Sequence, residues 1–135
     1  MSDQTVEAFA AIFGLPVVSA CIWNVKIEGL KTISEKNTRE HYMRKAARVN
    51  EQKRRVWMAL QTPSFKAFQV KPPRLVKLIR YAPRKLDSDN LARALSAVRD
   101  QIAASLGIND GRDDITAWTY GQERGDVGVR IEFWR

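Results

Sequence analysis

The sequence predicts a single α+β domain in which helices pack on a mixed β-sheet. The chain has 135 residues, which is enough for one modest hydrophobic core but not for two. Four segments have the composition or alternation of strands, and two longer ones repeat apolar residues at helical spacing. Its 44% apolar and 28% charged residues are typical of a globular protein. We therefore treat residues 1–135 as one domain.

The first half of the chain predicts two helices and a strand. Residues 5–13 favour a short helix that ends before Gly14 and Pro16, and residues 17–27 favour a strand that ends near Gly29. Residues 31–37 are polar and predict a loop. Thr38 is a suitable cap for a helix that runs to about residue 60. The apolar positions of this helix predict a stripe facing the core: Tyr42, Ala46, Val49, Val56 and Leu60.

The second half predicts a central strand, one helix and a hairpin. Residues 61–74 contain three prolines and predict irregular structure, whereas residues 75–81 are too apolar for a strand with one exposed face. A helix ending at Gly107 is predicted next, followed by a loop over residues 108–114. Residues 115–120 and 127–133 predict strands of a hairpin turning at residues 123–126. The apolar face of the helix contains Leu91, Leu95, Val98, Ile102 and Leu106.

Charge and rare residue types narrow the function classes. The net charge is +8 with a pI near 10.0, which makes nucleic acid the leading partner because Lys and Arg neutralise phosphates. Neither end contains a basic amphipathic anchor for a membrane surface.

One cysteine, Cys21, excludes an intrachain disulfide and fits a reducing compartment, and one histidine, His41, argues against histidine-rich metal sites. The acidic segment before residue 8 lacks the positive region of a secretion signal, so we expect a cytoplasmic protein.

One acidic region stands out in this basic chain. Residues 87–114 contain six aspartates and three arginines. Asp87 and Asp89 are two residues apart, so in an extended segment they would point the same way, with Asp89 also able to cap the next helix. Asp110 follows that helix and must be brought back by the fold. These carboxylates would suit Mg²⁺, or Mn²⁺, and a metal-activated water that attacks a phosphodiester.

Structural roles for the same residues stay open. An Asp-x-Asp-Asn sequence before a helix is most often helix capping and turn chemistry. The pair Asp113 and Asp114 is typical of a solvated loop, and a basic helix face can be an ordinary solvated surface.

The run YAPRKLDSDNL at residues 81–91, then Val-Arg-Asp at 98–100 and LGINDG at 106–111, resembles the RusA family of Holliday-junction resolvases. Its phage and prophage-type members are the closer match, since Tyr-Gly-Gln at 120–122 and Val-Arg-Ile-Glu at 129–132 also fit their tail. The resemblance covers residues 75–133. It implies a RusA-like fold and a homodimeric, magnesium-dependent endonuclease that nicks four-way DNA junctions symmetrically.

The resemblance also implies site residues. The catalytic, metal-binding aspartates fall on Asp87, Asp89 and Asp110, with Asp113 as the alternative to Asp110. The family carries a functional lysine on the following helix, and this chain has Arg93 or Ser96 there, depending on register. Both would share the helix face of Asp89. An arginine can stabilise phosphate charge but cannot exchange a proton as a lysine does. Asn109 replaces a second aspartate that is frequent in the family.

We therefore expect a branched-DNA endonuclease of recombination and repair, acting as a homodimer, with no small-molecule substrate and no membrane partner. Arg93 would support the scissile phosphate. Two alternatives remain: a non-catalytic branched-DNA-binding protein with a decayed metal site, and a nuclease for flaps or forks. The expected DNA-binding residues are Arg84, Lys85, Arg39, Arg44, Lys45, Arg48, Lys53, Arg54 and Arg55.

Overall fold

The computed structural model describes residues 18–33, 42–108 and 116–135. Within these ranges the chain forms four strands and four helices, which confirms the predicted α+β class. The predicted helix at residues 5–13 and most of the predicted loop at 108–114 lie outside the described residues. The elements are β1 (Cys21–Glu28), α2 (Tyr42–Ala59), α3 (Pro63–Val70), β2 (Leu75–Ala82), α4 (Ser88–Ala94), α5 (Ser96–Leu106), β3 (Ala117–Arg124) and β4 (Gly128–Trp134).

The four strands form one mixed sheet in the order β1-β4-β2-β3. β4 is antiparallel to both of its neighbours, whereas β2 and β3 are parallel. β2 is therefore central, as predicted. The predicted hairpin is wrong, because β2 lies between β3 and β4. The helical return through α4 and α5 brings β3 in parallel to β2, and the short turn after β3 then passes the end of β2, where Gly125 N–H donates to the Ala82 carbonyl at 3.2 Å.

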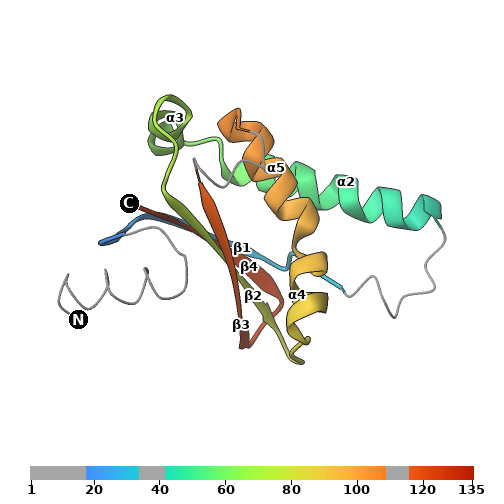
Figure 1. Ribbon diagram of the computed structural model, residues 1–135. Coiled ribbons are helices and arrows are strands. Elements are labelled where there is room, and N and C mark those ends of the chain that lie inside the picture. Colours follow the sequence, from blue (N-terminus) through green and yellow to red (C-terminus); the bar gives the residue numbers. More distant parts are fainter. Residues whose placement is uncertain (1–17, 34–41, 109–115) are drawn as a thin grey trace.

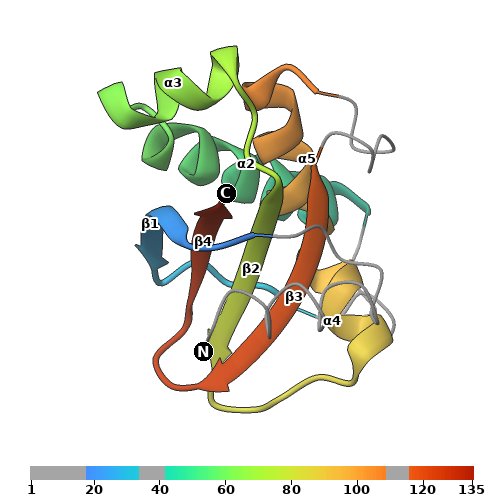
Figure 2. The same ribbon diagram turned by 60° about the vertical axis from the view of Figure 1, so that its left-hand side comes forward.

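The helices cover one face of the sheet. Figure 1 shows α2, α4 and α5 on that face, and Figure 2 shows α3 at the end of the sheet where β2 begins. Alternation places one side of each strand against the helices. The resulting core includes Val76 and Leu78 of β2, Ile131 of β4, and all five apolar residues predicted for the helix after residue 90.

α2 is only partly packed on this core. Val56 and Leu60 are almost fully buried, as predicted, but Tyr42 is 75% exposed and Ala46 is also exposed. The predicted core stripe is therefore wrong in the first half of the helix. Figure 1 shows the reason: the N-terminal half of α2 extends beyond α5, so none of the other labelled elements covers its apolar positions. Residues 38–41, where the helix was predicted to begin, lie outside the described residues.

α3 occupies a segment that was predicted to be irregular. Thr62 caps it by accepting the Phe65 N–H at 3.3 Å, and Pro63 stands in the first turn, where its missing N–H costs nothing. Phe65 and Phe68 are buried, with ring centroids 5.9 and 4.9 Å from that of Phe133 in β4. The prediction of irregular structure from three prolines is wrong because Pro63 fits the first turn of a helix, and only Pro72 and Pro73 lie outside α3.

The predicted helix after residue 90 is two helices. α4 ends at Ala94, and Leu95 departs from helical geometry at φ −98° and ψ 3° before α5 begins. Leu95 itself is fully buried. Gly107 ends α5 in the left-handed conformation at φ 74°, as predicted for a glycine at this position. The break at Leu95 separates α4, which contains Asp89, from α5, which contains most of the apolar stripe.

Candidate metal centre and nucleic-acid surface

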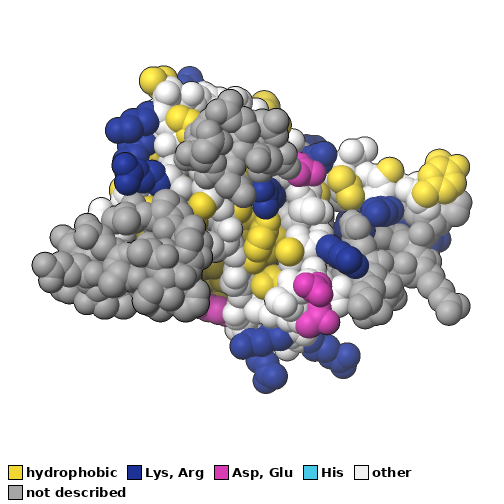
Figure 3. All heavy atoms as spheres, in the orientation of Figure 1, with side chains coloured by type: hydrophobic (Ala, Val, Ile, Leu, Met, Phe, Trp, Pro, Cys, Tyr) yellow, Lys and Arg dark blue, Asp and Glu magenta, His cyan; other side chains and the backbone are white. Residues whose placement is uncertain are grey.

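Asp87 and Asp89 lie where the chain leaves β2 and enters α4. Asp87 is the N-cap of α4: its backbone is extended, and Oδ1 accepts the Asn90 N–H at 3.0 Å. Asp89 stands in the first turn. Both side chains belong to exposed residues, so a cation and a phosphate can approach them. Figure 3 shows acidic side chains gathered over α4, with basic side chains on either side.

Two details of the expected geometry are wrong. Asp87 and Asp89 do not share one extended segment, because α4 already begins at Ser88. Asp87, rather than Asp89, is the residue that caps the helix. One oxygen of Asp87 is thus committed to the Asn90 N–H, while no described residue binds its other oxygen.

The described residues supply two carboxylates of the expected metal set. No cluster of three or more His, Cys, Asp or Glu side chains is found among residues 18–33, 42–108 and 116–135. Asp110 and its alternative Asp113 both lie outside those ranges. Magnesium commonly binds one or two protein carboxylates and completes its shell with waters and substrate phosphate, so the donor chemistry of Asp87 and Asp89 fits this ion.

The backbone that leads into Asp87 is fixed from β3. The Gln122 side chain accepts the Leu86 N–H at 2.9 Å and donates to the Leu86 carbonyl at 2.6 Å. Sequence reasoning missed this role. A signal existed, because Gln122 shares one strand face with Trp118 and Tyr120, both of which pack on the core. A polar residue at that position needs a hydrogen-bonding partner.

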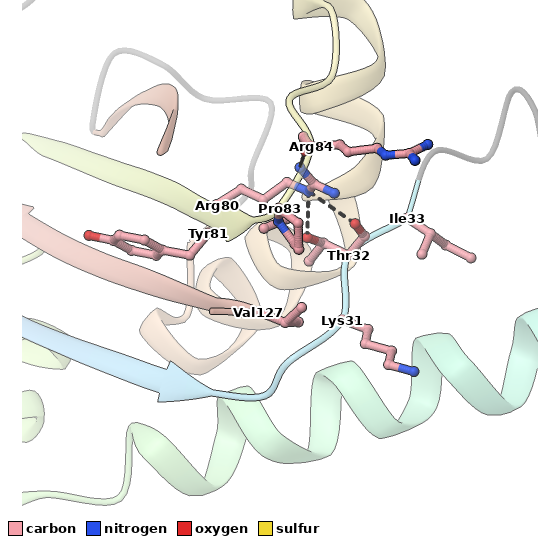
Figure 4. A pocket seen from close by; sticks show the side chains of 9 residues that line it. Lys31, Thr32, Ile33, Arg80, Tyr81, Pro83, Arg84 and Val127 are labelled. Carbon is pink, nitrogen blue, oxygen red and sulfur yellow. Dashed lines mark hydrogen bonds between the residues drawn. The ribbon is translucent and has the colours of Figure 1, made fainter. Parts of the chain in front are cut away.

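Arg80 of β2 also holds the backbone that leads to Asp87. Arg80 is only 8% exposed, and its Nη1 donates to the Arg84 carbonyl at 2.8 Å. Its Nε lies 3.0 Å from both the carbonyl oxygen and Oγ1 of Thr32 (Figure 4). Burial lowers the pKa of this guanidinium. Sequence reasoning missed Arg80 too, although an arginine on the helix-facing side of an apolar strand is the kind of exception that has a structural or functional cause.

Asn90 is a third residue that the sequence did not single out. It is 6% exposed, and its Oδ1 is buried without a hydrogen-bond partner in the described part of the chain. An unpaired buried amide oxygen is costly, and such atoms are rare in folded proteins. Asn90 lies immediately after Asp89.

The helix break decides which residue can stand in for the family lysine. Arg93 is in the last turn of α4, four residues after Asp89 on the same helix, and it is exposed. Ser96 belongs to α5, after the break at Leu95, and its hydroxyl donates to the Arg93 carbonyl at 2.9 Å. The expectation that both share the helix face of Asp89 therefore holds for Arg93 alone.

The expected DNA-binding residues fall into two groups. Arg84 and Lys85 are exposed beside Asp87, whereas the others lie on α2, except Arg39, which is outside the described residues. Within α2, Arg44, Lys45 and Arg54 belong to exposed residues, and Arg48, Lys53 and Arg55 are half-buried.

Arg54 and Arg55 of α2 have partners within the protein. Arg54 makes a two-pronged contact with Glu51, with Nη2 to Oε1 at 2.7 Å and Nε to Oε2 at 2.9 Å. This hydrogen bond lowers the pKa of Glu51 and raises that of Arg54. Arg55 donates to the Glu28 carbonyl at the end of β1. These two residues are less available to DNA than Arg44.

No family model matches the chain, and no curated protein matches it. In the described residues no helix is long and apolar enough to cross a membrane.

Proposed function

We propose that this chain is a metal-dependent, structure-specific DNA endonuclease that resolves four-way junctions by paired, symmetric nicks. The observation that carries the proposal is the placement of Asp87 and Asp89, exposed at the start of α4 on a backbone held by Gln122 and Arg80. The RusA-like motif of the sequence and the basic charge of the chain support the same reading.

The chemistry assigns a role to each residue. Asp87, Asp89 and Asp110 would hold Mg²⁺ or Mn²⁺, which lowers the pKa of a bound water and neutralises the leaving oxygen of a phosphodiester. Arg93 would face the scissile phosphate. Arg84, Lys85 and the basic residues of α2 would hold the DNA arms by contacts to phosphates, which position a duplex without reading its sequence. A homodimer with twofold symmetry would present two such sites to opposed strands.

The second candidate function is a branched-DNA-binding protein without catalysis. One observation favours it: Asp87 already has a structural role as the cap of α4, which does not require a metal. A nuclease that acts on flaps or forks uses the same residues and differs only in substrate.

The decisive experiment is cleavage of a labelled synthetic four-way junction in Mg²⁺ or EDTA, beside linear duplex, flap and fork controls. Paired nicks that require the metal and spare linear duplex are expected. Asp87→Asn should abolish nicking while leaving junction binding intact. The control Asp126→Asn, at an exposed acid in the turn before β4, should change neither nicking nor binding. Tight binding with no nicks in either metal would instead establish the binding protein, and nicks confined to flaps or forks would reassign the substrate.

A further inference from the structure

An open cleft includes Arg84, three residues before Asp87 in the chain. It has a volume of about 410 Å³ and is formed by the connection after β1, the end of β2 and the start of the β2–α4 connection. The residues that matter for its chemistry are Lys31, Thr32, Arg80 and Arg84, with Ile33 and Pro83 among the apolar part of the wall.

The cleft contains positive side chains, and none of the residues that line it is acidic. Arg80 is a buried residue, 8% exposed, and every acceptor found for its guanidinium is a neutral oxygen of Thr32 or Arg84. Within the described residues no carboxylate pairs with it. Burying a cation without a counter-charge is costly. Lys31 and Arg84 add positive charge at the same place, so an anion that entered the cleft would relieve this cost.

The walls of the cleft are held in place before any ligand arrives. Gln52 of α2 donates to the Lys31 carbonyl at 2.6 Å, and Arg80 fixes Thr32 on one side and Arg84 on the other. Figure 4 shows the Lys31 and Arg84 side chains on either side of the segment that contains Thr32 and Ile33, extending in the same direction. Tyr81 points the opposite way in this view. The backbone that carries these cations is thus held by contacts within the protein before an anion enters the cleft.

We infer that this cleft, lined by Lys31, Arg80 and Arg84, is a phosphate-binding site. The anion site rests on the geometry above. Its assignment to DNA rests on the proposed function and deepens it. Asp87 follows Arg84 by three residues, a reach of about 10 Å in an extended chain. This reach is short enough for one DNA strand to place a phosphodiester in the cleft and another at Asp87 and Asp89.

The first test measures the salt dependence of junction binding. In Mg²⁺-free buffer, the double variant Lys31→Gln/Arg84→Gln should lower the slope of log K against log salt by about one, the loss of roughly one phosphate contact. The matched control is Lys66→Gln/Lys71→Gln, which removes the same charge from exposed positions in and just after α3, at the other end of β2. An unchanged slope in the cleft variant, or an equal fall in both pairs, overturns the inference.

The second test observes Arg80 itself, because its replacement could disturb the fold. The ¹⁵N side-chain signal of Arg80 in the wild-type protein is followed while inorganic phosphate or a short oligothymidylate is added. A shift with the oligonucleotide supports a strand phosphate, a shift with inorganic phosphate alone supports the anion site but overturns its assignment to DNA, and no shift with either overturns both. Junction nicking is scored separately. If the protein nicks junctions but the Arg80 signal does not shift, the proposed endonuclease function stands and the phosphate site in the cleft is wrong. If the Arg80 signal shifts but no nicks form, the phosphate site stands and the endonuclease function is wrong.

Discussion

Gln122 of β3 holds both backbone polar groups of Leu86, with Oε1 2.9 Å from the Leu86 nitrogen and Nε2 2.6 Å from its oxygen. The contact joins the edge strand of the sheet to the residue immediately before Asp87. A primary amide is the side chain that can accept and donate in this way at once. The position of the Asp87 carboxylate therefore depends on a residue 35 positions away in the sequence.

Gln122→Leu should impair the proposed cleavage more than it impairs folding. It leaves the Leu86 N–H and carbonyl without their partner, and the loss of two hydrogen bonds predicts a free-energy cost of about 1–3 kcal/mol, measured by urea denaturation. The Mg²⁺ concentration for half-maximal junction nicking should rise, since Asp87 is no longer held in place. Glu123→Leu, the adjacent and exposed position, is the control and should change neither quantity. An unaltered Mg²⁺ requirement in Gln122→Leu would show that the contact is only structural.

Gly128→Ala should destabilise the sheet. A Cβ atom at Gly128 would lie 2.9 Å from the Ile27 carbonyl oxygen of β1, a contact with backbone that cannot rotate away. We expect the free energy of unfolding to fall by about 1–3 kcal/mol, as for other overpacked sites. Gly121→Ala in β3 is the matched control, because its Cβ would meet only Ile79 at an ordinary 3.8 Å. Equal stability of the two variants, measured by thermal unfolding, would contradict the close approach of β1 and β4.

The sequence predicted the fold class and the apolar faces well, and for a physical reason. The apolar composition of residues 75–81 predicts a central β2, and helical periodicity predicts the core face of the following helix, namely Leu91, Leu95, Val98, Ile102 and Leu106. Periodicity does not report what lies opposite a helix, and Tyr42 and Ala46 were misplaced for that reason. It also cannot tell a hairpin from two strands separated by a third, which requires the non-local pairing of β2 with β3.

The aspartates of the candidate site could be predicted from the sequence, but the residues that hold their backbone could not. Asp87 and Asp89 were found because two carboxylates in a basic chain are conspicuous. Gln122 and Arg80 could be noticed only as polar residues on the core-facing side of a strand, because a single sequence does not show which backbone groups they bind. The break at Leu95 was hidden as well, because a buried leucine continues the apolar pattern whether or not its backbone is helical.

Arg93→Lys tests whether the guanidinium limits the proposed reaction. If the cation only stabilises phosphate charge, both side chains serve and the rate of junction nicking should change by less than about threefold, while Arg93→Gln should lower it at least tenfold, or about 1.4 kcal/mol in the barrier. A large gain in Arg93→Lys alone would show that a proton must be exchanged at this position. Ser96→Lys is the control on α5, and nicking that rises there instead would place the functional position after the helix break.

Substitutions at Asp87 separate its capping role from its proposed metal role. Asp87→Asn retains an acceptor for the Asn90 N–H, because asparagine is as good an N-cap as aspartate, and the free energy of unfolding should change by no more than about 0.5 kcal/mol. Asp87→Ala removes the acceptor and should cost about 1 kcal/mol. Both should abolish Mg²⁺-dependent nicking if the carboxylate binds the ion. Asp89→Asn, which removes a carboxylate that does not cap, should abolish nicking with little change in stability. Nicking that survives in Asp87→Asn but not in Asp87→Ala would mean that the cap, and not a metal ligand, is what the reaction requires.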